Sequence, residues 1–219
     1  MPALAPVDSV DIQVLVDNVT DSLSSVPDFV ETEMAGLGRR RGAAWVMGGA
    51  CLCCAAHGLS CLLTIRAAQT IAGDSVFVSG EIPRTSGFET GLPGQHRRTE
   101  DGTGWEPDEL LMDERFIAVH VRGKGLVVLT ACSHAGVVNV LTEARDRFPG
   151  VKLHAVLGGL HLSGTNERII PQTVAALRDF DLDVIAAGHC TGWRALSALA
   201  NAFGDAKLAP LAVGKRLSF

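Results

Sequence analysis

The sequence predicts a layered α/β domain in which sheets are covered by helices. Strand-like segments first follow one another in hairpin order and then alternate with amphipathic helical segments, which is the order of a layered α/β domain. The composition is 47% hydrophobic and 20% charged, which is typical of a globular chain with a full core. The length of 219 residues favours one domain over residues 1–219.

The first part of the chain is poorer in regular structure. Its β-rich segments predict three strands, at Val10–Val16, His57–Ile65 and Ser75–Ser79. Residues 22–50 are rich in Gly, Ser and Arg and predict a long irregular excursion. Residues 85–109 combine Gly, Pro, Thr and charge without a period, and they predict a long loop of the kind that forms lids.

The second part predicts a hairpin followed by three helices. The hairpin strands are Arg115–Val121 and Leu126–Thr130, joined by a glycine-rich turn. Apolar residues recur at helical spacing over residues 137–148, 174–180 and 193–203. Pro171 suits the first turn of the second helix, and Gly204 suits the end of the third. A last strand is expected over Leu211–Val213.

Charge and hydropathy exclude several classes of function. The net charge of -5 argues against nucleic-acid binding, since phosphate contacts need clustered Lys and Arg. The short basic run Arg39–Arg41 is expected to be a solvated loop. No stretch reaches the roughly 18 apolar residues of a membrane span. The N-terminus lacks the pattern of a secretory signal, so a cytoplasmic location is expected. The sequence leaves the oligomeric state open.

Six cysteines are expected to stay reduced in such a compartment. The cluster Cys51–Cys54 suggests a metal or thiol-redox site, but a zinc ribbon needs a second paired set. We favour the interpretation that these are small buried residues. A thiol-redox role for Cys51, Cys53 and Cys54 ranks third among the possible functions.

Three histidines each follow an apolar, strand-like stretch. They are His134, His161 and His189, and each has Gly or Ser beside it. Because the ends of such strands line one crevice of an α/β sheet, we expect the three side chains to converge. Imidazole nitrogens suit zinc, iron and related metals, so the three predict a metal site. Cys190 is a further donor, but adjacent side chains on an extended segment point apart.

The remaining histidines have simpler interpretations. His120 and His154 lie inside predicted strands, and His57 and His96 are expected to be structural or solvated. The pair Ser133–His134 suggests a nucleophile with its base. Adjacent residues rarely form the hydrogen bond that this requires, and no G-x-S-x-G motif is present.

Six motifs in order give the chain a family resemblance. They are Val16–Thr20, His57–Ser60, Ser79–Arg84, Thr130–Gly136, Gly158–Leu162 and Gly188–Gly192. This series resembles the metallo-β-lactamase-fold subfamily that includes the archaeal dihydropterin–ribofuranosylaminobenzene phosphate synthases. The resemblance implies an αβ/βα sandwich with a metal site at one sheet edge. It implies histidine ligands at His134 and His189, and it places His161 near the position of a bridging acid in related proteins.

The chain departs from the family at one point. No H-x-H-x-D-H motif occurs anywhere, and the segment that carries it in the family is missing near residues 66–75. We therefore expect an incomplete N-terminal half, an exposed sheet edge, and weak or absent binding of zinc or another divalent metal.

These observations lead to two main hypotheses. The first is a metal-dependent hydrolase or transferase of this superfamily with impaired activity, acting on a small molecule that is phosphorylated or pterin-like. The second is a non-catalytic binding or regulatory remnant of the same fold.

Overall fold

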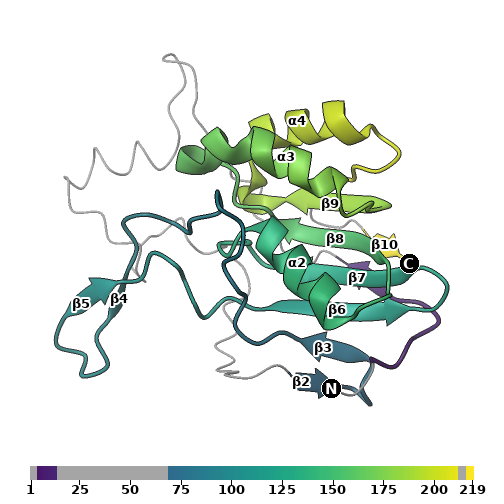
Figure 1. The fold of residues 1–219 in the computed structure, drawn as a ribbon, viewed down its shortest axis with the longest axis horizontal. Helices are drawn as coiled ribbons and strands as arrows, with labels where there is room; N and C mark the ends of the chain where they lie inside the picture. The colour runs from purple at the N-terminus through teal and green to yellow at the C-terminus, as the bar shows by residue number, and fades with distance from the viewer. Residues whose placement is uncertain (1–3, 14–68, 212–215) are drawn as a thin grey trace.

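A central six-stranded sheet organises the part of the chain that the structure describes. The computed structural model describes residues 4–13, 69–211 and 216–219 (Figure 1). Along the sheet the strands are β2 (Gln69–Ile71), β3 (Val76–Val78), β6 (Phe116–Val121), β7 (Gly125–Thr130), β8 (Leu153–Gly159) and β9 (Val184–Gly188). The first four pair antiparallel, whereas β7, β8 and β9 pair parallel.

Three helices cover one face of this sheet. They are α2 (Val137–Arg147), α3 (Ile170–Arg178) and α4 (Trp193–Phe203). Short 3₁₀ helices, η1 (Gly164–Ile169) and η2 (His189–Thr191), lie between the last strands and these helices. Figure 1 shows α3 and α4 stacked beyond β9 and α2 lying across β7 and β8. The predicted helices and the hairpin of β6 and β7 are confirmed.

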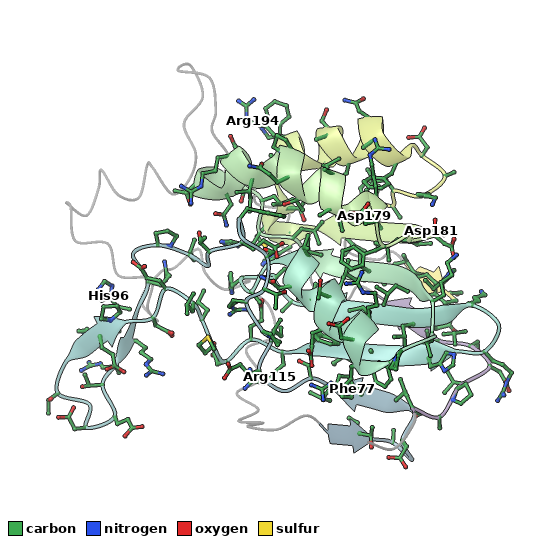
Figure 2. The ribbon with its side chains drawn as sticks, viewed as in Figure 1. Phe77, His96, Arg115, Asp179, Asp181 and Arg194 are labelled. Atoms are coloured by element: carbon green, nitrogen blue, oxygen red, sulfur yellow. The ribbon has the colours of Figure 1, made fainter. Side chains whose placement is uncertain are left out.

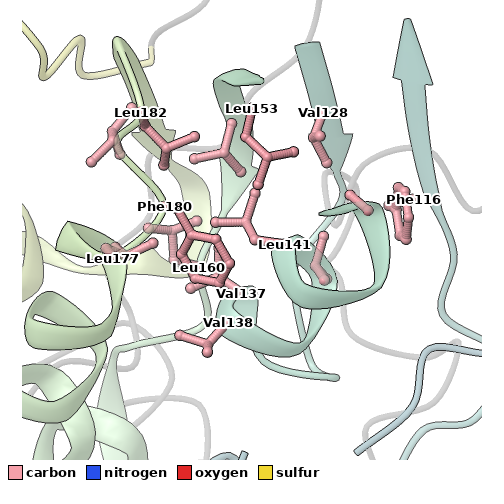
Figure 3. Close-up of a cluster of buried hydrophobic side chains, with 14 of the residues drawn as sticks. Phe116, Val128, Val137, Val138, Leu141, Leu153, Leu160, Leu177, Phe180 and Leu182 are labelled. Carbon is pink, nitrogen blue, oxygen red and sulfur yellow. The ribbon is translucent and has the colours of Figure 1, made fainter. Parts of the chain in front are cut away.

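The sheet is buried on both faces, which explains the continuous apolar run of β7. Leu126 and Val128 of β7 join the core beneath the helices, together with Leu141 of α2 and Leu177 of α3 (Figure 3). Val127 points to the opposite face. There it packs in a second cluster that includes Val121, Leu157 and Phe219, beside apolar residues of the terminal strands.

The two ends of the chain meet on that second face. Strand β1 (Asp11–Gln13) pairs antiparallel with β10 (Arg216–Ser218) as a separate two-stranded sheet. Residues 207–211 run beside β9, where Leu208 forms a parallel bridge to Ile185 and Leu211 donates to the carbonyl of Ala187 at 2.9 Å. Leu211 lies outside any named strand, so the strand expected at Leu211–Val213 is wrong at this residue. Residues 212 and 213 are outside the described residues.

One predicted loop is corrected, and the region of the missing segment is partly described. The loop expected over residues 85–109 contains a hairpin of β4 (His96–Arg98) and β5 (Trp105–Pro107), which projects from the body of the domain (Figures 1 and 2). The region near residues 66–75 contains β2, which pairs with β3 through the turn at Ala72–Asp74. Strand β2 is the edge of the described sheet, and Ile71 on it is 47% exposed.

Several predictions fall outside the described residues. These are the excursion at residues 22–50, the basic run Arg39–Arg41, the cluster Cys51–Cys54, the strand His57–Ile65 with its histidine, most of Val10–Val16, and the motif Val16–Thr20. Among the helices of the described ranges, none is both long enough and apolar enough to cross a membrane.

A distant carboxylate caps helix α2. The backbone N–H groups of Val138 and Asn139 each donate to Glu89 at 2.9 Å. Gly136, which precedes the helix with φ 92°, leaves room for this carboxylate, because a Cβ there would lie 2.1 Å from the Glu89 carboxyl carbon. Burial raises the pKa of Glu89, and the two helix N–H groups oppose that rise. The loop before the site is thereby fixed to α2.

The buried side chain of Asn139 completes this connection. Its Oδ1 accepts from the backbone N–H groups of Thr85 at 2.9 Å and Ser86 at 2.8 Å, and its Nδ2 donates to the carbonyl of Ala135 at 2.7 Å. Replacing it with alanine removes the acceptor of both backbone N–H groups and the donor to Ala135.

We predict that Asn139→Ala lowers the free energy of unfolding by about 2–4 kcal/mol, because two backbone donors lose their acceptor. Denaturant unfolding of the full chain measures this. Asp146→Ala, at an exposed position of the same helix, is the matched control and should change stability by less than about 0.5 kcal/mol. Equal effects of the two substitutions would contradict the role assigned to Asn139.

Candidate metal centre

The ends of three strands meet at one edge of the sheet. Because β7, β8 and β9 are parallel neighbours, the segments that follow them lie side by side. The backbone N–H of Gly159, at the end of β8, donates to the carbonyl of Ala131, just past β7, at 2.9 Å. The hydroxyl of Ser133 donates to the carbonyl of Gly159 at 2.8 Å. Cys132, His134, His161, His189 and Cys190 each follow one of these strands.

A left-handed backbone conformation marks each of the three strand ends. Ser133 has φ 57°, His161 has φ 45° and His189 has φ 53°. Such conformations cost a non-glycine residue about 1–3 kcal/mol and concentrate at functional sites. They turn the chain sharply after each strand, which directs the following side chains toward the shared edge.

The structure brings the three predicted histidines together. The rings of His134 and His161 meet edge to face, with centroids 4.5 Å apart. His134 and His189 both lower the pKa of the Cys132 thiol. His134 and His189 also lower the pKa of His161. The three imidazoles therefore lie in one neighbourhood at the strand ends.

Two cysteines belong to the same cluster. The ligand atoms of Cys132, His189 and Cys190 all lie within 4.8 Å of one another. The expectation that Cys190 points away from His189 is wrong, because the chain is not extended there. It enters the 3₁₀ helix η2 at His189, which places both side chains on one side. Cys132 carried no signal of its own in the sequence beyond its position two residues before His134.

Contact between the two thiols moves their pKa values in opposite directions. Hydrogen bonding from Cys190, and then from His134 and His189, lowers the pKa of Cys132 well below its ordinary value against the opposing effect of burial. The pKa of Cys190 is raised by its contact with Cys132 and by burial. The cluster therefore stabilises a thiolate next to imidazole donors.

His161 is buried and carries an unpartnered polar atom. Burial first, and then the neighbouring charge of His134, lower the pKa of His161 to about 4. Its ring is therefore neutral near pH 7. Its Nδ1 is enclosed and has no hydrogen-bond partner, so a lone pair or N–H there is available to a bound group.

His134 is held by a carboxylate. Glu114 accepts the backbone N–H groups of His134 at 2.9 Å and Ala135 at 2.6 Å. The Nδ1 of His134 lies 3.8 Å from the same carboxylate. Burial opposes a charge on this imidazole, but the contact with Cys132 and the charge of Glu114 outweigh burial and raise the pKa of His134.

The residues present fit a divalent metal ion. Thiolate sulfur and imidazole nitrogen are the donors that zinc prefers in proteins. Two atoms bound to one zinc ion lie about 3.5–4 Å apart, so donors already within 4.8 Å need only a small contraction. The unpartnered Nδ1 of His161 adds a polar atom on the ring that lies beside His134.

The other described histidines lie elsewhere, in agreement with their predicted roles. His154 of β8 places its Nδ1 2.7 Å from the carboxylate of Asp183. His120 lies within β6, and His96 is exposed on the projecting hairpin (Figure 2).

Comparison with known proteins supports the family resemblance. No protein-family model matches the chain. A region of 85 residues is 40% identical to the 7,8-dihydropterin-6-methyl-4-(β-D-ribofuranosyl)-aminobenzene-5'-phosphate synthase of Methanocaldococcus jannaschii. That match covers 38% of this chain and 28% of the synthase, so the chain spans less than a third of this relative's length.

A solved structure has the same fold. It is a metal-dependent hydrolase of the β-lactamase superfamily, with a TM-score of 0.60 and 26% sequence identity. The alignment covers 70% of this chain and 56% of the hydrolase. The predicted α/β fold class and the resemblance to metallo-β-lactamase-fold proteins are both confirmed.

We predict that Glu114→Gln lowers the pKa of His134 in the metal-free protein. The substitution removes a negative charge 3.8 Å from Nδ1. Titration of the imidazole by NMR measures the change. The exposed Glu81→Gln is the control and should leave His134 unchanged. An unshifted His134 in Glu114→Gln would show that the carboxylate does not act on this ring.

Proposed function

We propose that this chain is a metal-dependent hydrolase- or transferase-like protein of the metallo-β-lactamase superfamily with impaired turnover. The observation that carries the proposal is the proximity of His134 to His161, and of His189 to Cys132 and Cys190, at the strand ends. The family implies a divalent metal at this edge, with zinc favoured by the donors. Single-domain organisation over residues 1–219 and a cytoplasmic location belong to the same proposal.

The chain's own residues have distinct parts in this proposal. A metal bound here would polarise a substrate oxygen and lower the pKa of bound water. His134 and His189 are the candidate histidine ligands. Glu114 fixes the backbone of His134 and compensates its charge. His161 is the third candidate ligand, because its ring is neutral near pH 7 and its Nδ1 has no hydrogen-bond partner.

The impairment follows from what the sequence lacks. A catalytic zinc ion has three protein ligands and a water, and two-metal sites need more. With no H-x-H-x-D-H motif in the chain, the three histidines alone would hold a metal weakly. The sequence puts the missing segment between Ile65 and Ser75, and we propose its part before Gln69 as the junction, because an insertion there leaves the β2–β3 hairpin intact.

The proposed substrate is a small molecule of the phosphorylated or pterin-like class. The support is the partial match to a synthase whose product is both pterin-containing and phosphorylated. The alternative function is a non-catalytic binding or regulatory protein that uses the same crevice. The missing motif favours this alternative, because ligand binding does not need an activated water.

We predict very slow hydrolysis of phosphodiester and lactone substrates even with zinc present. The physical reason is the absence of the motif that would complete the catalytic ligand set. Rates with zinc, with a chelator and in His134→Ala should agree within about threefold. Rapid turnover that the chelator and His134→Ala both abolish would refute the impairment and exclude the non-catalytic alternative.

We also predict that the impairment can be repaired. Inserting the corresponding family segment between Arg66 and Gln69 should increase the metal bound per chain and raise the melting temperature together. The insert supplies ligands, and metal that binds only the folded state adds stability by mass action. Elemental analysis and calorimetry measure the two effects.

The matched control for this repair is the same insert with its motif histidines and aspartate changed to alanine. It should keep any gain that comes from packing and lose the gain in metal. A repaired chain that holds no more metal than its parent would contradict the assignment of His134 and His189 as ligands.

A further inference from the structure

We propose that Cys132, His189 and Cys190 form a mononuclear zinc site, in which two thiolates take the place of the missing histidine cluster. This inference rests on the proposed function, because it assumes a metal at this sheet edge, and it names the ligands. It keeps His189 but differs from the ligand set that the resemblance implies, which is His134 and His189 together with His161 and no sulfur.

The geometry favours the sulfur-containing set. All three donor atoms of Cys132, His189 and Cys190 lie within 4.8 Å of one another, before any metal draws them together. Among the described residues no group that contains His134 or His161 meets this condition. Zinc bound by two cysteines and one histidine, with a fourth position open, is an established arrangement for a catalytic ion.

A close approach at Gly159 makes the cluster possible. A Cβ at this position would lie 2.6 Å from the Cys190 sulfur and 3.3 Å from the Cα of Cys132. Strand β8 therefore ends in a residue without a side chain where it passes between the two cysteine segments. Any larger residue would push Cys190 away from its partner.

Charge balance favours the same set. Two thiolates neutralise a zinc ion, whereas three neutral imidazoles would leave its double charge uncompensated in a largely buried site. An uncompensated buried charge is costly. Both thiols must lose their protons, so each bound ion releases up to two protons, and the bonds formed are two Zn–S bonds and one Zn–N bond.

The surrounding residues hold the ligand segments in place. The carbonyl of Cys190 accepts from the backbone N–H of Ser163 at 3.3 Å and from its hydroxyl at 3.0 Å. The hydroxyl of Thr191 donates to Gly188 at 2.6 Å and accepts from the N–H of Leu160 at 3.0 Å. These bonds tie η2 to the segment after β8. Such outer contacts orient metal ligands and commonly set affinity.

Cobalt(II) titration of the full, reduced chain tests the ligand assignment. The expected result is an intense near-ultraviolet sulfur-to-cobalt band that saturates at one ion per chain. Cys132→Ser and Cys190→Ser should each weaken binding at least tenfold and diminish the band. His134→Ala should retain the band, as should Cys61→Ser, a control that removes a cysteine that is not one of the proposed ligands.

Gly159→Ala tests the close approach without altering a ligand. It should weaken cobalt binding, while circular dichroism of the metal-free chain stays close to that of the parent. Should this variant fail to fold, the unmodified chain still provides a test. With zinc bound, Cys132 and Cys190 should be protected from alkylation, as read by mass spectrometry, and a chelator should remove the protection.

The outcomes separate this inference from the proposed function. Cobalt bound without a sulfur band, and lost in His134→Ala, would overturn the thiolate ligands and leave the proposed function standing. Protection at Cys51, Cys53 or Cys54 in place of Cys132 and Cys190 would overturn the inference, as would a Cys132–Cys190 disulfide that persists after reduction. The absence of cobalt binding in every variant would overturn both.

Discussion

Parallel pairing forces neighbouring strands to end at the same edge of a sheet, and β7, β8 and β9 are paired in this way. Their apolar residues are buried on both faces, so none of the three can slip in register without exposing core side chains. The hydrophobic core therefore fixes where each strand ends, and so fixes the positions of Cys132, His161 and His189 just beyond those ends. The geometry of the site therefore depends on the packing of the core beneath it.

Two glutamates extend this rigidity to the loops. Glu89 caps α2 from one side, and Glu114 accepts the N–H groups of the turn that precedes the same helix. Both carboxylates come from the segment between β3 and β6, so the hairpin-bearing region is fixed to the helical layer. The backbone N–H groups at and just before the start of α2 therefore donate to these two carboxylates, and the carboxylate of Glu114 lies beside His134.

Periodicity was enough to predict the elements that are apolar on one side. Helix α2 follows directly from it, and the strands β6 and β7 follow from two β-rich runs around a glycine-rich turn. The strand-then-histidine pattern predicted which strand ends lie together. The hairpin of β4 and β5 was missed because polar contacts hold it: Arg97 pairs with Glu106, and Arg98 lies over the ring of Trp105. The direction of the Cys190 side chain was predicted wrongly, because the left-handed backbone conformation of His189 turns the chain there. Composition does not predict such a conformation at a single residue.

The cysteines that meet at the site are 58 positions apart, and everything between them belongs to the β7–β9 part of the fold. The ligand-bearing segment is therefore one uninterrupted stretch of chain. This stretch can be inherited as one piece, because loss, exchange or rearrangement of sequence before residue 69 leaves it covalently whole. A lineage can lose one half of a composite site in a single event and still pass on the other half, on which later selection acts.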